Sequence, residues 1–306
     1  MRRYIVLAIA VLAISAITGC IQSKKSIEVA TLQGGISTLD ILMENNYGLN
    51  LKVHQLSNTL EILSALSKGE VDIAVIPAEM AAKFIQSGGK IKIIAVDMYQ
   101  NQAVLSKNES IKSCKDLKGK KIAALTASGT YHMFRAYLKL VYGIDNVNVI
   151  NTQPGSLVLV LKRGDVDAIV AWEPIVSQAI VEAGAHVVEN FTDLWKKSGK
   201  TGKPVMLVWV AREDLDENAI KSFLWAREEA AKKWISDRNY TISILMKHYG
   251  ISKDVAESVY NRVEICSKNL DDELIDNIKE VWSIAWLGGY LKENPSKITK
   301  DVFYKC

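Results

Sequence analysis

The amino-acid sequence predicts an α/β protein of two lobes, in which each lobe is a mainly parallel sheet flanked by helices and a helical C-terminal region packs on the first lobe. Three observations carry this prediction: one stretch occurs twice, strand and helix patterns alternate through both copies, and the last third is helical almost throughout. The 306 residues suffice to bury one large core or two of medium size.

The repeated stretch reads LSKGEVDIAVIPAE at 66–79 and LKRGDVDAIVAWEP at 161–174, so that Gly69 matches Gly164 at an offset of 95 residues. The same offset places IEVATLQGG of the first copy over IAALTASGT of the second, and about seventy residues align without a gap. A period of this length is too long for a solenoid or propeller repeat. It indicates two copies of one α/β unit.

The N-terminal segment has the pattern of an export signal. MRRYIVLAIAVLAISAITGC begins with two arginines, continues with an apolar run and ends in small residues before Cys20, which resembles a prokaryotic lipoprotein signal. The run is shorter than the roughly 20 residues that span a bilayer but suits a signal-peptide core. We therefore expect a signal peptide over 1–19 and a lipidated Cys20 with a tether over 20–26. A plain secretory signal with an incidental cysteine stays open.

The first copy alternates strands and helices, which favours a sheet covered on both faces. The predicted strands are Ile27–Thr31, Leu51–Gln55, Val71–Ile76 and Ile91–Val96. The predicted helices are Thr38–Asn46, Thr59–Ser67 and one that Pro77 opens, where the missing N–H of proline costs least.

The segment from Gln102 to Lys121 is expected to cross into the second copy, which repeats the pattern. Its predicted strands are Ile122–Leu125, Val147–Asn151, Ala168–Ala171 and His186–Val188, and its predicted helices are Tyr131–Val141, Leu157–Arg163 and Ile175–Ala183. The strand VMLVWVA after Lys203-Pro204 is interpreted as a return crossing. Lobe 1 then comprises 27–101 with 205–306, lobe 2 comprises 102–204, and the hinges lie near 97–103 and 202–208.

The C-terminal region is predicted to be helical over Asp214–Ile235, Ile242–Tyr249, Lys253–Asn261 and Leu270–Leu287. It contains Trp225, Trp234, Trp282 and Trp286, which at helical spacing we interpret as core residues rather than ligand-stacking ones.

Composition argues against several classes of function. The net charge is only +4 and no basic tract interleaves with aromatic residues, so nothing indicates nucleic-acid binding. Cys114, Cys266 and Cys306 match no zinc spacing, and no metal site is expected. Whether Cys266 and Cys306 form a disulfide stays open.

Ligands of open α/β sheets bind outside the carboxyl ends of the strands, and the two copies supply matching loops there. The candidate ligand-binding residues are Gln33, Gly34, Gly35, Asn58 and Glu79 in the first copy and Ser128, Gly129, Thr130, His132, Gln153, Trp172 and Glu173 in the second. The start of a helix at SGT favours an anion, because its backbone N–H groups are free. The hydroxyls there also fit a helix cap.

The acidic residues of these loops complicate a purely anionic ligand. Glu79 and Glu173 fall at equivalent positions, and the loops contain no arginine or lysine. A ligand with both an acidic and an amino end fits better, as does an amino-bearing heterocycle held against Trp172. A favourable charge near a helix N-terminus is the alternative role for both glutamates.

The lipoprotein signal, ALSKGEVDIAVIPAEMAAKF, DLKGKKIAALTASGTYH and LKRGDVDAIVAWEPIVSQAI together resemble the substrate-binding lipoproteins of ABC importers, in the branch for sulfonates, taurine, nitrate, bicarbonate and thiamine pyrimidine precursors. The resemblance implies a two-lobe type II periplasmic-binding-protein fold that closes on a small molecule and delivers it to a permease driven by an ATPase.

On this resemblance we expect a monomer without cofactor or catalytic residues, anchored through Cys20 on the extracytoplasmic side of a bacterial or archaeal membrane. A ligand sensor for a membrane receptor, or a biosynthetic enzyme on the same fold, are the alternatives.

Overall fold

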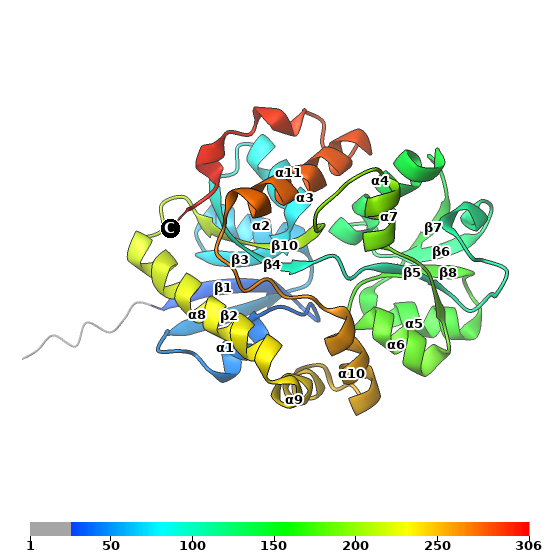
Figure 1. The fold of residues 1–306 in the computed structure, drawn as a ribbon, viewed down its shortest axis with the longest axis horizontal. Coiled ribbons are helices and arrows are strands. Elements are labelled where there is room, and N and C mark those ends of the chain that lie inside the picture. The colour runs from blue at the N-terminus through cyan, green and yellow to red at the C-terminus, as the bar shows by residue number, and fades with distance from the viewer. Residues whose placement is uncertain (1–25, 306) are drawn as a thin grey trace, which may run out of the picture.

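The computed structural model describes residues 26–305 and confirms the α/β architecture of two lobes (Figure 1). The predicted signal peptide, the lipidated Cys20 and most of the tether lie outside the described residues, as does Cys306 of the possible disulfide. Cys114 and Cys266 are both buried. Within residues 26–305 no helix has the length and apolar character needed to cross a bilayer.

The first sheet is parallel except for one strand. Its members are β1 (Ile27–Leu32), β2 (Leu51–Leu56), β3 (Ile73–Pro77), β4 (Ile91–Tyr99) and β10 (Val205–Arg212). Their order is β2-β1-β3-β10-β4, with β10 antiparallel to both neighbours. The helices between these strands are α1 (Leu39–Glu44), α2 (Thr59–Lys68) and α3 (Ala78–Gln86).

The second sheet repeats this plan. Its members are β5 (Ala103–Ser106), β6 (Lys121–Ala124), β7 (Asn148–Asn151), β8 (Ala168–Ala171) and β9 (His186–Asn190), in the order β7-β6-β8-β5-β9 with β5 antiparallel. Its helices are α4 (Gly129–Tyr142), α5 (Pro154–Arg163), α6 (Ile175–Ala183) and α7 (Phe191–Lys197). The sequence analysis assigned neither β5 nor α7 as an element.

The two copies correspond as expected near Gly69 and Gly164, which both end a helix in the left-handed conformation. The gap-free alignment is wrong in the first strand. Val29 pairs with Ile73, whereas Ile122 pairs with Ala168. Because Ala168 lies 95 residues after Ile73, the counterpart of Val29 is Ile122, only 93 residues later.

The C-terminal region contains α8 (Glu217–Ser236), α9 (Arg238–Tyr249), α10 (Lys253–Arg262) and α11 (Asp272–Leu287). As predicted it packs on the first lobe, α8 against α1 and β4 and α11 against α3. It also reaches the second lobe, because α10 packs on α6 and α11 on α4 (Figure 1). Trp234 and Trp282 are buried, but Trp225 is 55% exposed, so its assignment to the core is wrong.

Candidate functional site

A cavity of about 50 Å³ lies between the two sheets. Its lining includes Gly35 after β1, Pro77 at the end of β3, Ser128 after β6 and Trp172 after β8, and it therefore sits at the carboxyl ends of parallel strands from both sheets. The volume leaves room for only a few water-sized groups. The lobes are closed around a small space.

The wall from the second sheet contains the N-terminus of α4. Ser128 caps this helix, because its Oγ accepts a hydrogen bond from the amide of Tyr131 at 3.1 Å. Within residues 26–305 the amide N–H groups of Gly129 and Thr130 donate no hydrogen bond, although the carboxyl group of Glu79 lies close to Gly129, and both residues line the cavity. Two free donors at the positive end of a fourteen-residue helix favour an acidic group at this wall.

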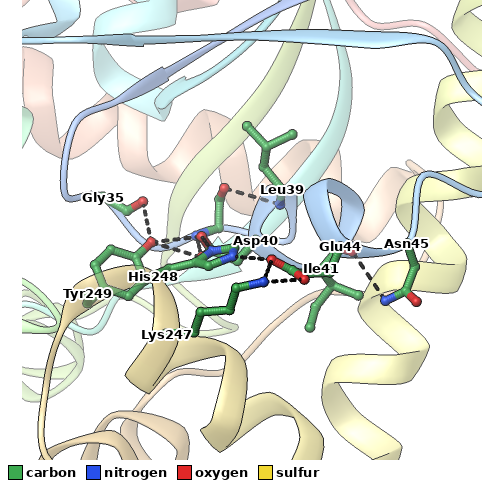
Figure 2. A network of polar contacts seen from close by, with 10 residues as sticks. Gly35, Leu39, Asp40, Ile41, Glu44, Asn45, Lys247, His248 and Tyr249 are labelled. Carbon is green, nitrogen blue, oxygen red and sulfur yellow. Dashed lines mark hydrogen bonds and ion pairs between the residues drawn. The ribbon is translucent and has the colours of Figure 1, made fainter.

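The wall from the first sheet is held by a polar network shown in Figure 2. The hydroxyl of Tyr249 on α9 lies 2.9 Å from the carbonyl oxygen of Gly35 and 2.9 Å from Oδ2 of Asp40. Nδ1 of His248 lies 3.0 Å from Oδ1 of Asp40, and its Nε2 lies 2.8 Å from Oε1 of Glu44. Hydrogen bonds to the two carboxylates, with Asp40 contributing most, raise the pKa of His248. The loop before α1 is therefore fixed by α9 of the C-terminal region.

A second anchor of this loop is buried. Asp97 at the end of β4 accepts hydrogen bonds from the hydroxyl of Thr38 and, at 2.8 Å, from Nε1 of Trp209. Burial raises the pKa of Asp97, while the hydrogen bond from Thr38 and the positive charge of Arg227 oppose that rise. The N-terminus of α1 is thus occupied by this protein's own carboxylates, unlike that of α4.

Glu173 lines the cavity and is 1% exposed, but its carboxylate is already engaged. Oε1 lies 2.6 Å from Nε of Arg262 on α10, and Oε2 accepts from the amide of Ser177 at 3.1 Å. Burial raises the pKa of Glu173, and the charge of Arg262 opposes the rise. This glutamate therefore joins the second lobe to the C-terminal region.

Glu79 is 3% exposed and does not line the cavity. It lies at the contact between the lobes, since a Cβ placed on Gly129 would be 2.0 Å from its Oε1. No other residue in the described part of the chain donates a hydrogen bond to its carboxylate, and burial raises the pKa of Glu79 to about 7. An uncharged carboxylic acid suits this position better than a carboxylate.

The structure places the twelve predicted residues in different surroundings. Those that line the cavity are Gly35, Ser128, Gly129, Thr130, Trp172 and Glu173. Gln33 and Gly34 border a neighbouring cavity of about 270 Å³, Asn58 caps α2, and Gln153 is an exposed residue at the start of α5. His132 stacks on Tyr290 with ring centroids 4.1 Å apart, and burial lowers the pKa of His132 to about 4.

The sequence analysis missed the polar residues of the crossing between the sheets. Asn101 and Gln102 both line the cavity and are both buried. The position of the crossing was itself a usable signal, because a segment that joins two facing lobes passes along the floor of the space between them. Among residues 26–305 no group of three or more histidine, cysteine or acidic side chains is arranged to hold a metal ion.

Comparisons with known proteins agree with this architecture. A taurine-binding periplasmic protein of Escherichia coli strain K12 is 26% identical over 210 residues, 66% of this chain and 63% of that protein. A putative aliphatic sulfonates-binding protein of the same strain is 26% identical over 205 residues, 65% of this chain and 62% of that protein. The match thus spans just under two thirds of the length of both relatives.

Solved structures show the same fold at low sequence identity. The alkanesulfonate-binding protein of Xanthomonas axonopodis pv. citri, bound to MOPS, superposes with a TM-score of 0.74 at 14% identity, covering 92% of this chain and 98% of that one. The periplasmic aliphatic sulphonate binding protein of Escherichia coli gives 0.71 at 19% identity, covering 88% and 89%. These likenesses confirm the type II periplasmic-binding-protein fold.

The sequence model of the NMT1-like family matches residues 40–245, which include strands of both sheets and α8 of the C-terminal region. This match covers more than half of the chain. The chain therefore belongs to the NMT1-like family.

Proposed function

We propose that this protein is the extracytoplasmic solute-binding component of an ABC importer, which captures a small solute between its two lobes and delivers it to a membrane permease. The observation that carries the proposal is the closed cavity between the lobes, lined from the strand ends of both sheets. Binding between two lobes that join through two crossings allows opening and closure by rigid-body motion. The proposed activity is binding, without a chemical step.

The proposed solute is a small organic acid of the sulfonate class. Free amides at the start of α4 suit its acidic group, and the lining contains no lysine or arginine. Much of the lining is apolar, contributed in part by Ile36, Val75, Met98 and Met206. An inorganic anion would leave these walls uncovered, whereas a short carbon chain would cover them. The sulfonate-binding relatives named above support this class.

The proposed lobes are 27–101 with 205–306, and 102–204. The chain passes between the sheets after Tyr99 and again before Val205, so the hinges are proposed there. The proposed partners are the permease and ATPase subunits of the importer, and the proposed form is a monomer. Lipid on Cys20 would keep the protein at the membrane surface.

A thermal-shift panel on the protein starting at Ser26 tests the proposal. The panel contains taurine, alkanesulfonates, nitrate, bicarbonate and aminopyrimidines, and native mass spectrometry first excludes a solute carried through purification. A solute at a hundred times its dissociation constant stabilises the folded state by about 2.7 kcal/mol, which raises the melting temperature by several degrees. A shift with a sulfonate is expected. A shift with nitrate or an aminopyrimidine alone would change the class, and no shift at all would overturn the proposed function.

A further inference from the structure

Gln102 is a buried polar residue whose side chain the fold does not use. It lies in the crossing between β4 and β5, is 3% exposed and lines the cavity. Its backbone is held in place, because its carbonyl oxygen accepts a hydrogen bond from the amide of Phe191 at 3.0 Å. Its side-chain Oε1 has no hydrogen-bond partner within residues 26–305.

The neighbouring Asn101 shows the contrast. Its Oδ1 accepts from the amide of Glu173 at 3.3 Å and its Nδ2 lies 3.2 Å from Sδ of Met98, so this side chain connects the crossing to both lobes. Two further buried side-chain atoms in the described part of the chain lack a hydrogen-bond partner, Nδ1 of His186 and Nε of Arg227, and neither residue lines the cavity. Gln102 alone of the three faces the space where a solute would bind.

An unpaired buried amide oxygen destabilises the folded protein unless something donates to it. No lysine or arginine lines the cavity, and the carboxylate of Glu173, which also lines it, is already paired with Arg262. A solute that carries a hydrogen-bond donor, and above all an amino group, therefore matches the part of the cavity lined by Gln102 better than a purely anionic solute does.

We propose that Gln102 accepts a hydrogen bond from an N–H or O–H group of the solute, so that the site selects acids that also carry a donor group, with zwitterionic amino acids of the sulfonate type as the best match. This inference rests on the proposed function. The acidic end binds at the amides of Gly129 and Thr130, and the donor end binds at Gln102.

Calorimetric titration with matched solutes tests the selection. Taurine and propane-1-sulfonate have the same number of non-hydrogen atoms but differ in the donor, and 2-hydroxyethanesulfonate offers a hydroxyl instead. We expect the protein to bind both donor-bearing solutes more tightly than propane-1-sulfonate, by on the order of tenfold or more. In Gln102→Met, which keeps the unbranched shape, the preference should fall to about threefold or less. Gln178→Met on α6, away from the cavity, should keep the full preference for the donor-bearing solutes.

The melting temperatures of the unliganded proteins give a second readout. If Gln102 serves the solute, removing its unpaired oxygen leaves the melting temperature of Gln102→Met unchanged or raises it. A lowered melting temperature would assign Gln102 a structural role and overturn the inference. Equal binding of taurine and propane-1-sulfonate by the unsubstituted protein would also overturn it while leaving the proposed function intact. If no solute of this series binds, the proposed sulfonate class is wrong. The melting temperatures alone then show whether Gln102 has a structural role.

Discussion

Nε of Arg262 lies 2.6 Å from Oε1 of Glu173, and this ion pair connects α10 to the end of β8 across the boundary between the lobes. Nearby, a hydrogen bond of 2.8 Å between the hydroxyls of Ser258 and Ser177 joins α10 to α6, the helix that follows β8. Because a buried carboxylate without its cation is costly, the pair favours the closed arrangement.

Replacing Arg262 by methionine should open the protein. Removing one partner of a buried pair costs about 3–5 kcal/mol while the other stays buried, and opening relieves that cost by exposing Glu173 to water. We expect a larger radius of gyration in small-angle X-ray scattering without solute, and weaker solute binding. The control is Arg238→Met, which removes a more exposed pair with Glu257 at 3.7 Å and should cost under about 1 kcal/mol. Identical scattering from both variants would count against this role of the pair.

Gly129→Ala should hinder closure. The added Cβ would lie 2.0 Å from Oε1 of Glu79 and 2.7 Å from Cβ of Pro77, both in the opposite lobe. Titration should show weaker solute binding, because closing the lobes would bring these atoms into the clash. The matched control is Gly155→Ala in the first turn of α5, where nothing lies within 4 Å. Equal affinities in the two variants would contradict the prediction.

Glu79 should make the stability fall as the pH rises. Burial raises the pKa of Glu79 from its ordinary 4.5 to about 7 in the folded protein, which therefore holds the proton more tightly than the unfolded chain does. Its contribution to the free energy of unfolding is complete below about pH 4.5. This contribution, up to about 3 kcal/mol, is lost as the pH rises through 7. The charged or titratable groups nearby are Lys83 on the same helix, Tyr137 on α4 and Tyr290 after α11.

Denaturant titrations at pH 4.5 to 8 measure this dependence. Glu79→Gln keeps an uncharged side chain of the same size, so it should lose this part of the pH dependence and be the more stable protein at pH 8. Glu70→Gln, at an exposed position of the same lobe, should behave like the unsubstituted protein. If Glu79→Gln and the unsubstituted protein fall in parallel with pH, the carboxyl group does not titrate as expected.

His248 should add a second pH dependence at higher pH. Its pKa is raised above the ordinary 6.5, chiefly by the hydrogen bond to Asp40 and also by that to Glu44, so the folded state favours the protonated ring. The stabilisation is complete below about pH 6.5 and is lost as the pH rises through the raised value. The melting temperature of His248→Asn should therefore decline less between pH 6 and 9 than that of the unsubstituted protein. His186→Asn, in the other lobe, serves as control, and equal slopes for all three would refute the prediction.

Replacing Cys20 by serine should release the protein from the membrane. Serine cannot carry the thioether-linked lipid that we propose for this position. Cell fractionation followed by immunoblotting should find the variant in the soluble extracytoplasmic fraction. A variant that stays with the membrane would exclude anchoring through Cys20.

The sequence predicted the elements with strong patterns and missed those with weak ones. Strands such as β3 are continuous apolar runs between a glycine turn and a helix start, so their type was clear. β5 has only four residues and α7 only seven, and neither lies in the repeated stretch that revealed equally short strands such as β8. The error in aligning the first strands of the two copies has a different cause. A shift of two residues keeps every side chain on the same face of the sheet, so the apolar pattern cannot reveal the shift.

The candidate site was predictable where it follows the strands and not elsewhere. Trp172 follows β8 directly and Ser128 lies in the loop between β6 and α4, so topology alone places both at the cavity. No local pattern could reveal that Glu173 pairs with Arg262, because 89 residues separate them. Nor could spacing show that Asn101 uses its side chain within the fold and that Gln102 does not, since this difference depends on groups from both lobes.

The strand order has a consequence for how the chain folds. The second sheet takes all its strands from the continuous segment 103–190, whereas in the first sheet β10 must enter between β3 and β4 from more than a hundred residues away. Strand pairings between distant segments form slowly, because a long loop has to close, at a cost in chain entropy, before the pairing can stabilise the sheet. Synthesis runs from the N-terminus, so the ribosome begins lobe 1 first, yet lobe 2 is the earlier one to have a complete sheet. We therefore expect the lobe that starts first to complete its sheet last.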